Sequence, residues 1–97
     1  MNKLKTDEID RLFETIMNFD SIDECVSFFE DICTIKEIQD MSQRLEVARM
    51  LNKNISYTEI SKATGASTAT ISRVNKSLIY GSDGYKRALL KMGEQKK

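Results

Sequence analysis

The chain contains no proline, and its four glycines all lie in the last third of its 97 residues. Proline and interior glycine are the residues that most often end or weaken a helix. Only polar capping residues therefore interrupt the first 64 residues, and no long stretch alternates with the period of two that a half-buried strand requires. The sequence predicts an all-α fold.

Apolar spacing and capping residues divide the chain into six predicted helices. Thr6 is the expected N-cap of the first, in which apolar residues recur three and four positions apart up to Met17. A Ser or Thr followed three residues later by Glu forms a capping box, which satisfies backbone amides at the start of a helix. Such boxes begin at Ser21, Thr34 and Ser56. The last two helices are expected to begin at Ser67 and Ser82.

The predicted helices carry more apolar surface than one small chain can cover. The first two helices and their junction hold all four phenylalanines. A chain of this size buries only about two-thirds of the surface that it exposes when unfolded. We therefore expect a two-fold homodimer; the alternative is a compact monomer with a slightly apolar surface. The central helix, which runs to about Asn52, is expected to bury Ile38, Met41, Leu45, Ala48 and Leu51.

The formal net charge of zero conceals a division between the two halves of the chain. Residues 1–48 hold five basic and twelve acidic side chains, whereas residues 49–97 hold ten basic and three acidic ones. This division indicates an acidic half that faces water or another subunit and a basic half that faces an anion. The alternative is an uneven distribution without functional meaning.

Several classes of protein are disfavoured by residues that the chain lacks. It has no histidine, the commonest general base and metal ligand, so neither an enzyme nor a metal site is expected. No apolar run approaches a membrane span, and the start resembles no signal peptide, so we expect a cytoplasmic protein. Cys25 and Cys33 lie too far apart on one helix for a disulfide, and we expect reduced, mostly buried thiols.

Residues 57–76 have the pattern of two short helices joined by a tight turn, the helix-turn-helix unit. Gly65 can take the left-handed conformation that ends the first helix. Ile60, Ile71 and Val74 are expected to form the small core that sets the angle between the helices. Ser61 is small where the two helices cross, which lets their backbones approach closely.

The outer face of the second helix is polar, and neither Asp nor Glu occurs from residue 60 to residue 82. A helix that only packs against others has no reason to exclude acids, whereas a surface that faces phosphates does. We therefore favour DNA binding over a hairpin with a purely structural role. The residues expected to contact DNA are Lys62, Ser67, Thr68, Ala69, Thr70, Ser72, Arg73 and Lys76.

The run from Gly65 to Arg73 (GASTATISR), followed by Asn75-Lys76-Ser77-Leu78, resembles the tryptophan-repressor superfamily. The resemblance extends from about Phe28 to Tyr85 and is closer to the YerC/YecD-type branch found in bacteria. It implies a six-helix fold and an intertwined homodimer in which the N-terminal and central helices of two chains wrap together. The implied segments of the single domain, 1–97, are 1–52 for dimerisation, 56–80 for the helix-turn-helix and 82–97 for a C-terminal helix and tail.

The resemblance also implies a pocket for a small-molecule corepressor. In the Trp repressor two arginines hold the indole of bound tryptophan. Val74 places a branched side chain where that repressor has glycine, and Cys33 replaces a leucine. Thr58 and Ser61 replace basic residues that face DNA. L-tryptophan is therefore expected to bind weakly or not at all, and the operator is expected to differ. The residues implied for the pocket are Thr34, Arg44, Thr70, Arg73 and Ser77.

These observations favour a transcriptional regulator, most simply a repressor, that binds double-stranded DNA as a homodimer and needs no cofactor. One alternative is a repressor that senses an amino acid or another small acid through the retained pocket. Another is a protein-interaction module that keeps the fold without binding DNA. Salt-dependent affinity for duplex DNA separates the first two hypotheses from the third.

Overall fold

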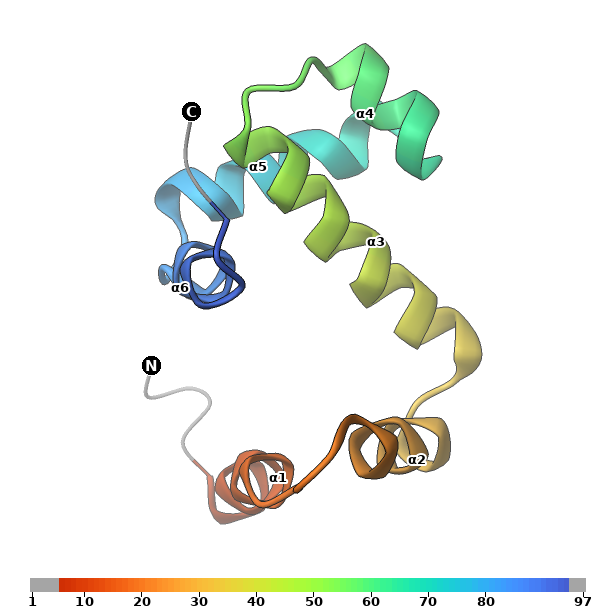
Figure 1. Ribbon diagram of the computed structural model, residues 1–97, viewed down its shortest axis with the longest axis vertical. Helices are drawn as coiled ribbons and strands as arrows, with labels where there is room; N and C mark the ends of the chain where they lie inside the picture. The colour runs from red at the N-terminus through yellow and green to blue at the C-terminus, as the bar shows by residue number, and fades with distance from the viewer. Residues whose placement is uncertain (1–5, 95–97) are drawn as a thin grey trace. The chain divides into compact units, whose positions relative to one another are not determined.

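The computed structural model describes residues 6–94, over which the chain forms six α-helices and no strand (Figure 1). The all-α prediction is confirmed. Residues 1–5 and 95–97, which belong to the predicted N-terminal segment and tail, lie outside the described residues. None of the described helices combines the length and apolar character needed to cross a membrane. The helices are α1 (Asp7–Met17), α2 (Ile22–Ile32), α3 (Ile35–Asn52), α4 (Tyr57–Thr64), α5 (Thr68–Tyr80) and α6 (Gly84–Lys91).

The hydroxyl groups predicted as N-caps accept hydrogen bonds at the starts of α1 to α5. At α3 both halves of the capping box form. The Glu37 amide donates to Thr34 Oγ1 at 3.1 Å, and the Thr34 amide donates to Glu37 Oε1 at 2.8 Å. Local hydrogen bonds of this kind set where the helices begin, because they satisfy amides that have no partner within the helix. The other capping bonds run from Ile9 N to Thr6, Glu24 N to Ser21, Glu59 N to Ser56 and Thr70 N to Ser67.

The last helix begins at Gly84, and the prediction that Ser82 opens it is wrong. Its N-cap is Asp83, which has φ 66° and ψ 10° and makes no capping hydrogen bond with its side chain. This left-handed conformation, which Asp tolerates better than most residues, cannot belong to a right-handed helix. The helix can therefore start only after Asp83. The Asp83 carboxylate instead forms an ion pair within the first turn, with Oδ1 3.8 Å from Lys86 Nζ.

The chain divides into two compact units, Met1–Ile38 and Gln39–Lys97. The first unit contains α1 and α2, neither of which has a buried residue. Its aromatic rings contact one another, with centroids 5.3 Å apart for Phe19 and Phe28 and 5.7 Å apart for Phe28 and Phe29. The large apolar side chains of α1 and α2 that stay exposed are Phe13, Met17, Ile22, Val26 and Ile32.

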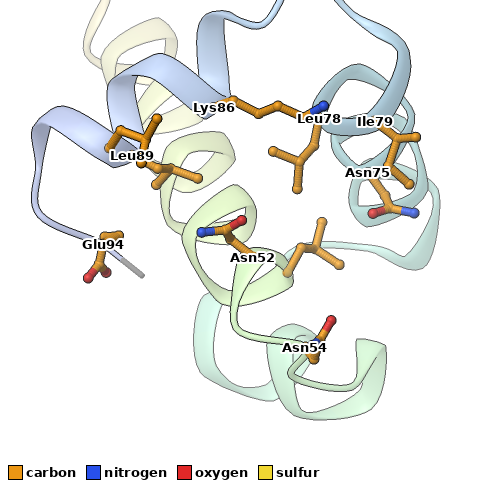
Figure 2. Close-up of a pocket in the computed structure, with 10 residues that line it drawn as sticks. Asn52, Asn54, Asn75, Leu78, Ile79, Lys86, Leu89 and Glu94 are labelled. Carbon is orange, nitrogen blue, oxygen red and sulfur yellow. The ribbon is translucent and has the colours of Figure 1, made fainter. Parts of the chain in front are cut away.

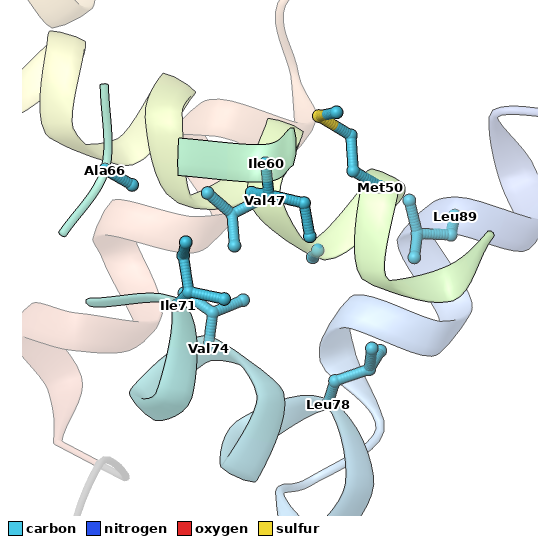
Figure 3. Close-up of a cluster of buried hydrophobic side chains, with 9 residues drawn as sticks. Val47, Met50, Ile60, Ala66, Ile71, Val74, Leu78 and Leu89 are labelled. Carbon is cyan, nitrogen blue, oxygen red and sulfur yellow. The ribbon is translucent and has the colours of Figure 1, made fainter. Parts of the chain in front are cut away.

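The hydrophobic core belongs to the second unit and joins α3, α4, α5 and α6 (Figure 3). The predicted cluster of Ile60, Ile71 and Val74 is confirmed, because all three side chains are buried in this core. Leu89 adds α6 to the same cluster. The core thus holds α5 in place on its inner side. Its buried residues are Val47, Ala48, Met50, Ile60, Ala66, Ile71, Val74, Leu78 and Leu89.

Two predictions of burial are wrong. On α3 the buried residues are Val47, Ala48 and Met50, so only Ala48 of the predicted set is buried. The buried residues all lie near the C-terminal end of α3, where the helix packs into the core of the second unit, whereas Met41 and Leu45 lie closer to its start and are exposed. The two cysteines are free thiols, as expected, but both are partly exposed: Cys25 lies on α2, which has no buried residue, and Cys33 is its C-cap.

Gly81 ends α5 in a position that excludes any larger residue. A Cβ atom there would overlap the carbonyl oxygen of Ser77, which accepts the Gly81 amide at 2.9 Å. We expect Gly81→Ala to lower the free energy of unfolding by about 1–3 kcal/mol, as overpacking does. Gly84→Ala is the matched control, since a Cβ at Gly84 meets no atom within 4 Å and alanine favours helices. Urea denaturation followed by circular dichroism measures both; equal destabilisation would contradict this account of Gly81.

Candidate nucleic-acid interface

A short turn at Gly65 joins α4 to α5 and ends α4 abruptly. Gly65 has φ 76° and ψ 3°, the left-handed conformation that glycine adopts without steric cost. Its amide donates to the Ser61 carbonyl at 2.8 Å, and Ser67 caps α5 on the other side of the turn. The predicted pair of short helices linked through a glycine is therefore present.

Side-chain hydrogen bonds fix the shape of this turn. Ser61, predicted only as a small residue at the crossing, also donates from Oγ to the Ala66 carbonyl at 2.8 Å. The Ala66 amide donates to Thr64 Oγ1 at 3.2 Å, and the Ala66 side chain is buried in the core. From α3, Gln43 Nε2 donates to the Thr64 carbonyl at 3.0 Å. Sequence reasoning missed Gln43, because its partner lies 21 positions further along the chain.

One face of α5 is exposed to solvent along its length. Residues three and four positions apart share a side of a helix, and Ile71, Val74 and Leu78 use the inner side to fill the core. A second set of α5 residues lies on a different side of the helix, and every one of them is exposed. We call this set the open face of α5; it consists of Thr68, Ala69, Ser72 and Lys76.

The open face carries small polar side chains and positive charge. Lys76 on α5 and Lys62 on α4 are both exposed, and neither forms an ion pair with another residue of the described range 6–94. No acidic residue lies between positions 60 and 82. Ser67 and Thr68 stand at the N-terminal end of α5, where backbone amides favour anions. Such a surface suits a polyanion with a groove that short side chains can enter.

A second side of α5 lines a cavity of about 190 Å³. Thr70, Arg73 and Ser77 repeat at helical spacing on this side. The structure therefore brings together four of the five residues implied for a ligand pocket, since Arg44 of α3 joins these three. Thr34 does not line the cavity; it belongs to the first unit, where it caps α3. The remaining lining residues are Val74 and Tyr85.

Tyr85 is a cavity residue that sequence reasoning missed. It belongs to α6 and is partly buried, and it also packs against the hydrophobic core. Nothing in the local sequence indicates that α6 folds back toward α5, so no signal could have placed Tyr85 beside Arg73. Thr70 and Arg73 were predicted both as DNA-contacting residues and as pocket residues, and in the structure both line this cavity.

The two cavity arginines differ from Arg49, another arginine of α3. Arg49 donates to Glu46 at 2.9 and 2.7 Å and to Glu94 at 2.8 Å. These hydrogen bonds lower the pKa of both carboxyl groups and raise the pKa of the Arg49 guanidinium. Among the described residues, by contrast, neither Arg44 nor Arg73 has a hydrogen-bond or ion-pair partner. Both guanidinium groups remain available to an anion.

A larger cavity of about 480 Å³ lies elsewhere in the second unit, between the end of α3, α5 and α6 (Figure 2). Half of its ten lining residues are leucine or isoleucine, and the polar half includes Lys86 and Glu94. It shares no residue with the smaller cavity or with the open face. Across residues 6–94, no three His, Cys, Asp or Glu side chains gather as metal ligands. The other lining residues are Leu51, Asn52, Asn54, Asn75, Leu78, Ile79, Leu89 and Leu90.

The chain has six helices, and the second helix of the turn-linked pair presents a polar face without acidic residues. This fold places the chain in the Trp repressor-like class of all-α proteins. The sequence profile of the family described as Trp repressor protein matches residues 7–93. The chain is 51% identical over 94 residues to an uncharacterised protein of Bacillus subtilis (strain 168), YerC, covering 97% of this chain and 90% of YerC. The chain belongs to the Trp repressor family.

Two solved structures have the same fold. A candidate Trp repressor from Staphylococcus aureus superposes with a TM-score of 0.94 at 44% identity, covering 99% of this chain and 96% of that protein. A TrpR-like protein from Eubacterium eligens ATCC 27750 gives a TM-score of 0.94 at 52% identity and covers both chains completely. The resemblance first seen between about Phe28 and Tyr85 therefore extends over nearly the whole chain. The family is one of regulatory proteins rather than enzymes.

Proposed function

We propose that the chain is a transcriptional regulator, most simply a repressor, that binds double-stranded DNA as a homodimer through α4 and α5. The observation that carries this proposal is the open face of α5, which is exposed at every position and lies in a segment without acidic residues. The core holds the inner side of α5, so the open face is presented on a rigid support. Membership of the Trp repressor family supports the same function.

The side chains of the open face suit the major groove. Short residues reach base edges only when the backbone lies deep in the groove or when water bridges the gap. Thr68 and Ala69 offer methyl groups that can contact the methyl group of thymine, and Ser72 offers a hydroxyl. Lys76 and Lys62 are placed to neutralise phosphates beside the groove, while the start of α5 offers backbone amides. In this arrangement Ser67 and Thr68 mark the end of α5 that enters the groove.

The homodimer is supported by the apolar surface of the first unit. No residue of α1 or α2 is buried, yet both helices carry large apolar side chains. Monomeric proteins rarely expose apolar surface of this extent unless it binds something. A two-fold dimer covers equivalent surfaces on both chains at once and presents two α5 helices to successive major grooves.

An effector-sensing regulator is the second candidate function, and the cavity beside α5 favours it. The cavity contacts Thr70, Arg73 and Ser77 of α5, so a ligand there would touch the helix that we assign to DNA recognition. A protein-interaction module without DNA affinity is the outcome expected if the open face does not bind phosphate. Measurements of DNA affinity at several salt concentrations separate these functions.

We expect Lys76→Ala to weaken binding to all duplexes by a similar factor. Removing one phosphate contact should also lower the slope of log affinity against log salt by about one. Lys91→Ala is the matched control, because it removes the same charge from an exposed position on α6, outside the open face. Fluorescence anisotropy with labelled duplexes at three or more salt concentrations measures both variants. Wild-type protein without salt-dependent DNA affinity would contradict the proposed function.

A further inference from the structure

The larger cavity of about 480 Å³, between the end of α3, α5 and α6, plays no part in the proposed DNA interface. We infer that it binds a small amphipathic anion, an aliphatic monocarboxylate of medium chain length such as hexanoate or octanoate. The carboxylate lies at Lys86 and the hydrocarbon chain lies along the leucine and isoleucine part of the wall. This inference goes beyond the proposed function, because binding here involves neither DNA nor the open face.

The apolar part of the cavity wall is continuous with the hydrophobic core, which holds it in place. Leu78 and Leu89 are buried and belong to both the core and the wall. Ile79 and Leu90 line the same cavity, but their side chains are 50% and 73% exposed. A hydrocarbon chain in the cavity removes such apolar surface from water, which is favourable. A volume of about 480 Å³ lies within the roughly 300–1,000 Å³ of most small-molecule sites.

The C-terminal end of α6 fixes another part of the wall. Gly93 has φ 83°, and its amide donates to the Leu90 carbonyl at 3.0 Å. The Glu94 amide donates to the Leu89 carbonyl at 2.9 Å. These two hydrogen bonds form the Schellman motif that ends many helices. They hold the Glu94 backbone at the end of α6, while its carboxylate accepts from Arg49 of α3 at 2.8 Å. This part of the wall is therefore in place before any ligand binds.

The charges on the wall favour an anion. Glu94 is neutralised from α3, since Arg49 lies 2.8 Å and Lys53 lies 3.6 Å from the same carboxylate oxygen. Lys86 extends from α6 toward α5 (Figure 2) and has a weaker partner, because its Nζ lies 3.8 Å from Asp83 Oδ1 and both side chains are about half exposed. Exposed ion pairs of this kind contribute little to stability. A ligand carboxylate can therefore replace Asp83 at Lys86, and the acidic residue of the wall is already neutralised.

The test uses the full chain without DNA at constant ionic strength. Acetate, hexanoate, octanoate and octanol are titrated, with methyl signals followed by NMR and heats by calorimetry. We expect octanoate to bind saturably with a Kd on the order of 0.1 mM and to shift the methyl signals of Leu78, Ile79 and Leu90. Hexanoate should bind up to about fifteenfold more weakly, because each buried methylene group contributes about fourfold, and acetate should not bind. No saturable octanoate binding, or shifts confined to α1 and α2, would overturn the inference.

Two variants separate the roles of the charge and the apolar wall. Lys86→Gln should weaken octanoate binding about tenfold, to the affinity that uncharged octanol shows for the wild type. Leu90→Gln should weaken the binding of both ligands about fivefold, because it removes part of the apolar wall. Both residues are exposed, so the variants should fold, which circular dichroism checks. Lys91→Gln is the control, an exposed cation of α6 outside the cavity. Equal losses of octanoate binding in Lys86→Gln and Lys91→Gln would show general charge attraction and overturn the site.

Sedimentation and DNA binding complete the test. If a second copy of the chain covers the cavity instead, Leu90→Gln lowers the dimer affinity and the wild-type dimer binds no octanoate, which would overturn the inference. Saturable octanoate binding by a protein that binds no duplex would leave the inference standing while the proposed function fails. The two proposals therefore fail in different measurements.

Discussion

Replacing Phe13 with aspartate is expected to separate the homodimer and to unfold much of the first unit. Phe13 lies on the apolar side of α1 and is 55% exposed in the single chain. Met17, on the same side, is 81% exposed. In a dimer this side becomes an interface, where a carboxylate without a partner is strongly unfavourable. The loss of a buried aromatic contact alone costs about 3–5 kcal/mol. We therefore expect dimer affinity to fall at least a hundredfold.

Sedimentation equilibrium at micromolar concentration measures this effect. The wild-type protein should sediment as a dimer of the 11.1 kDa chain, and dilution should lower its melting temperature. Thr15→Asp is the matched control, because it adds the same charge at an exposed position of α1 away from the apolar side. A well-folded wild-type monomer of 11.1 kDa under these conditions would exclude the obligate homodimer.

Replacing Thr68 with glutamine is expected to change which DNA sequence the protein prefers. Thr68 is the first residue of α5 and lies on the open face, where a longer side chain meets different base edges. Each affected base pair should change the binding free energy by about 1–3 kcal/mol, which is roughly 5- to 150-fold in affinity. Since glutamine adds no charge, the salt dependence should stay that of the wild type.

Competition between the preferred duplex and single-base variants measures this change in preference. Lys76→Ala provides the contrast, because a lost phosphate contact should weaken all of these duplexes alike. If Thr68→Gln and Lys76→Ala both lose affinity equally on specific and random DNA, α5 does not read bases.

The helix boundaries could be predicted because they depend on near neighbours in the chain. Ser21, Thr34, Ser56 and Ser67 each accept a hydrogen bond from an amide three residues away, so the sequence contains both partners of every cap. Gly65 likewise acts through its own backbone conformation. Short-range physical chemistry therefore explains why six helices and the turn between α4 and α5 were predictable.

The site was only partly predictable, because its remaining parts depend on tertiary packing. Tyr85 reaches the cavity through the return of α6, and Gln43 reaches Thr64 across 21 positions of sequence. The buried part of α3 was misassigned for the same reason, since periodicity gives an apolar side but not the stretch of it that another element covers. Asp83 adopts a left-handed conformation that helical periodicity does not reveal, so α6 begins at Gly84 and not at Ser82.

Selection of random duplexes by the purified wild-type protein tests DNA recognition by the homodimer most directly. We expect an enriched sequence with two-fold symmetry whose half-sites are centred about 34 Å apart, one turn of the double helix, because each α5 enters one of two successive major grooves. Absence of enrichment, or enrichment of a single asymmetric site, would contradict recognition by two symmetry-related α5 helices.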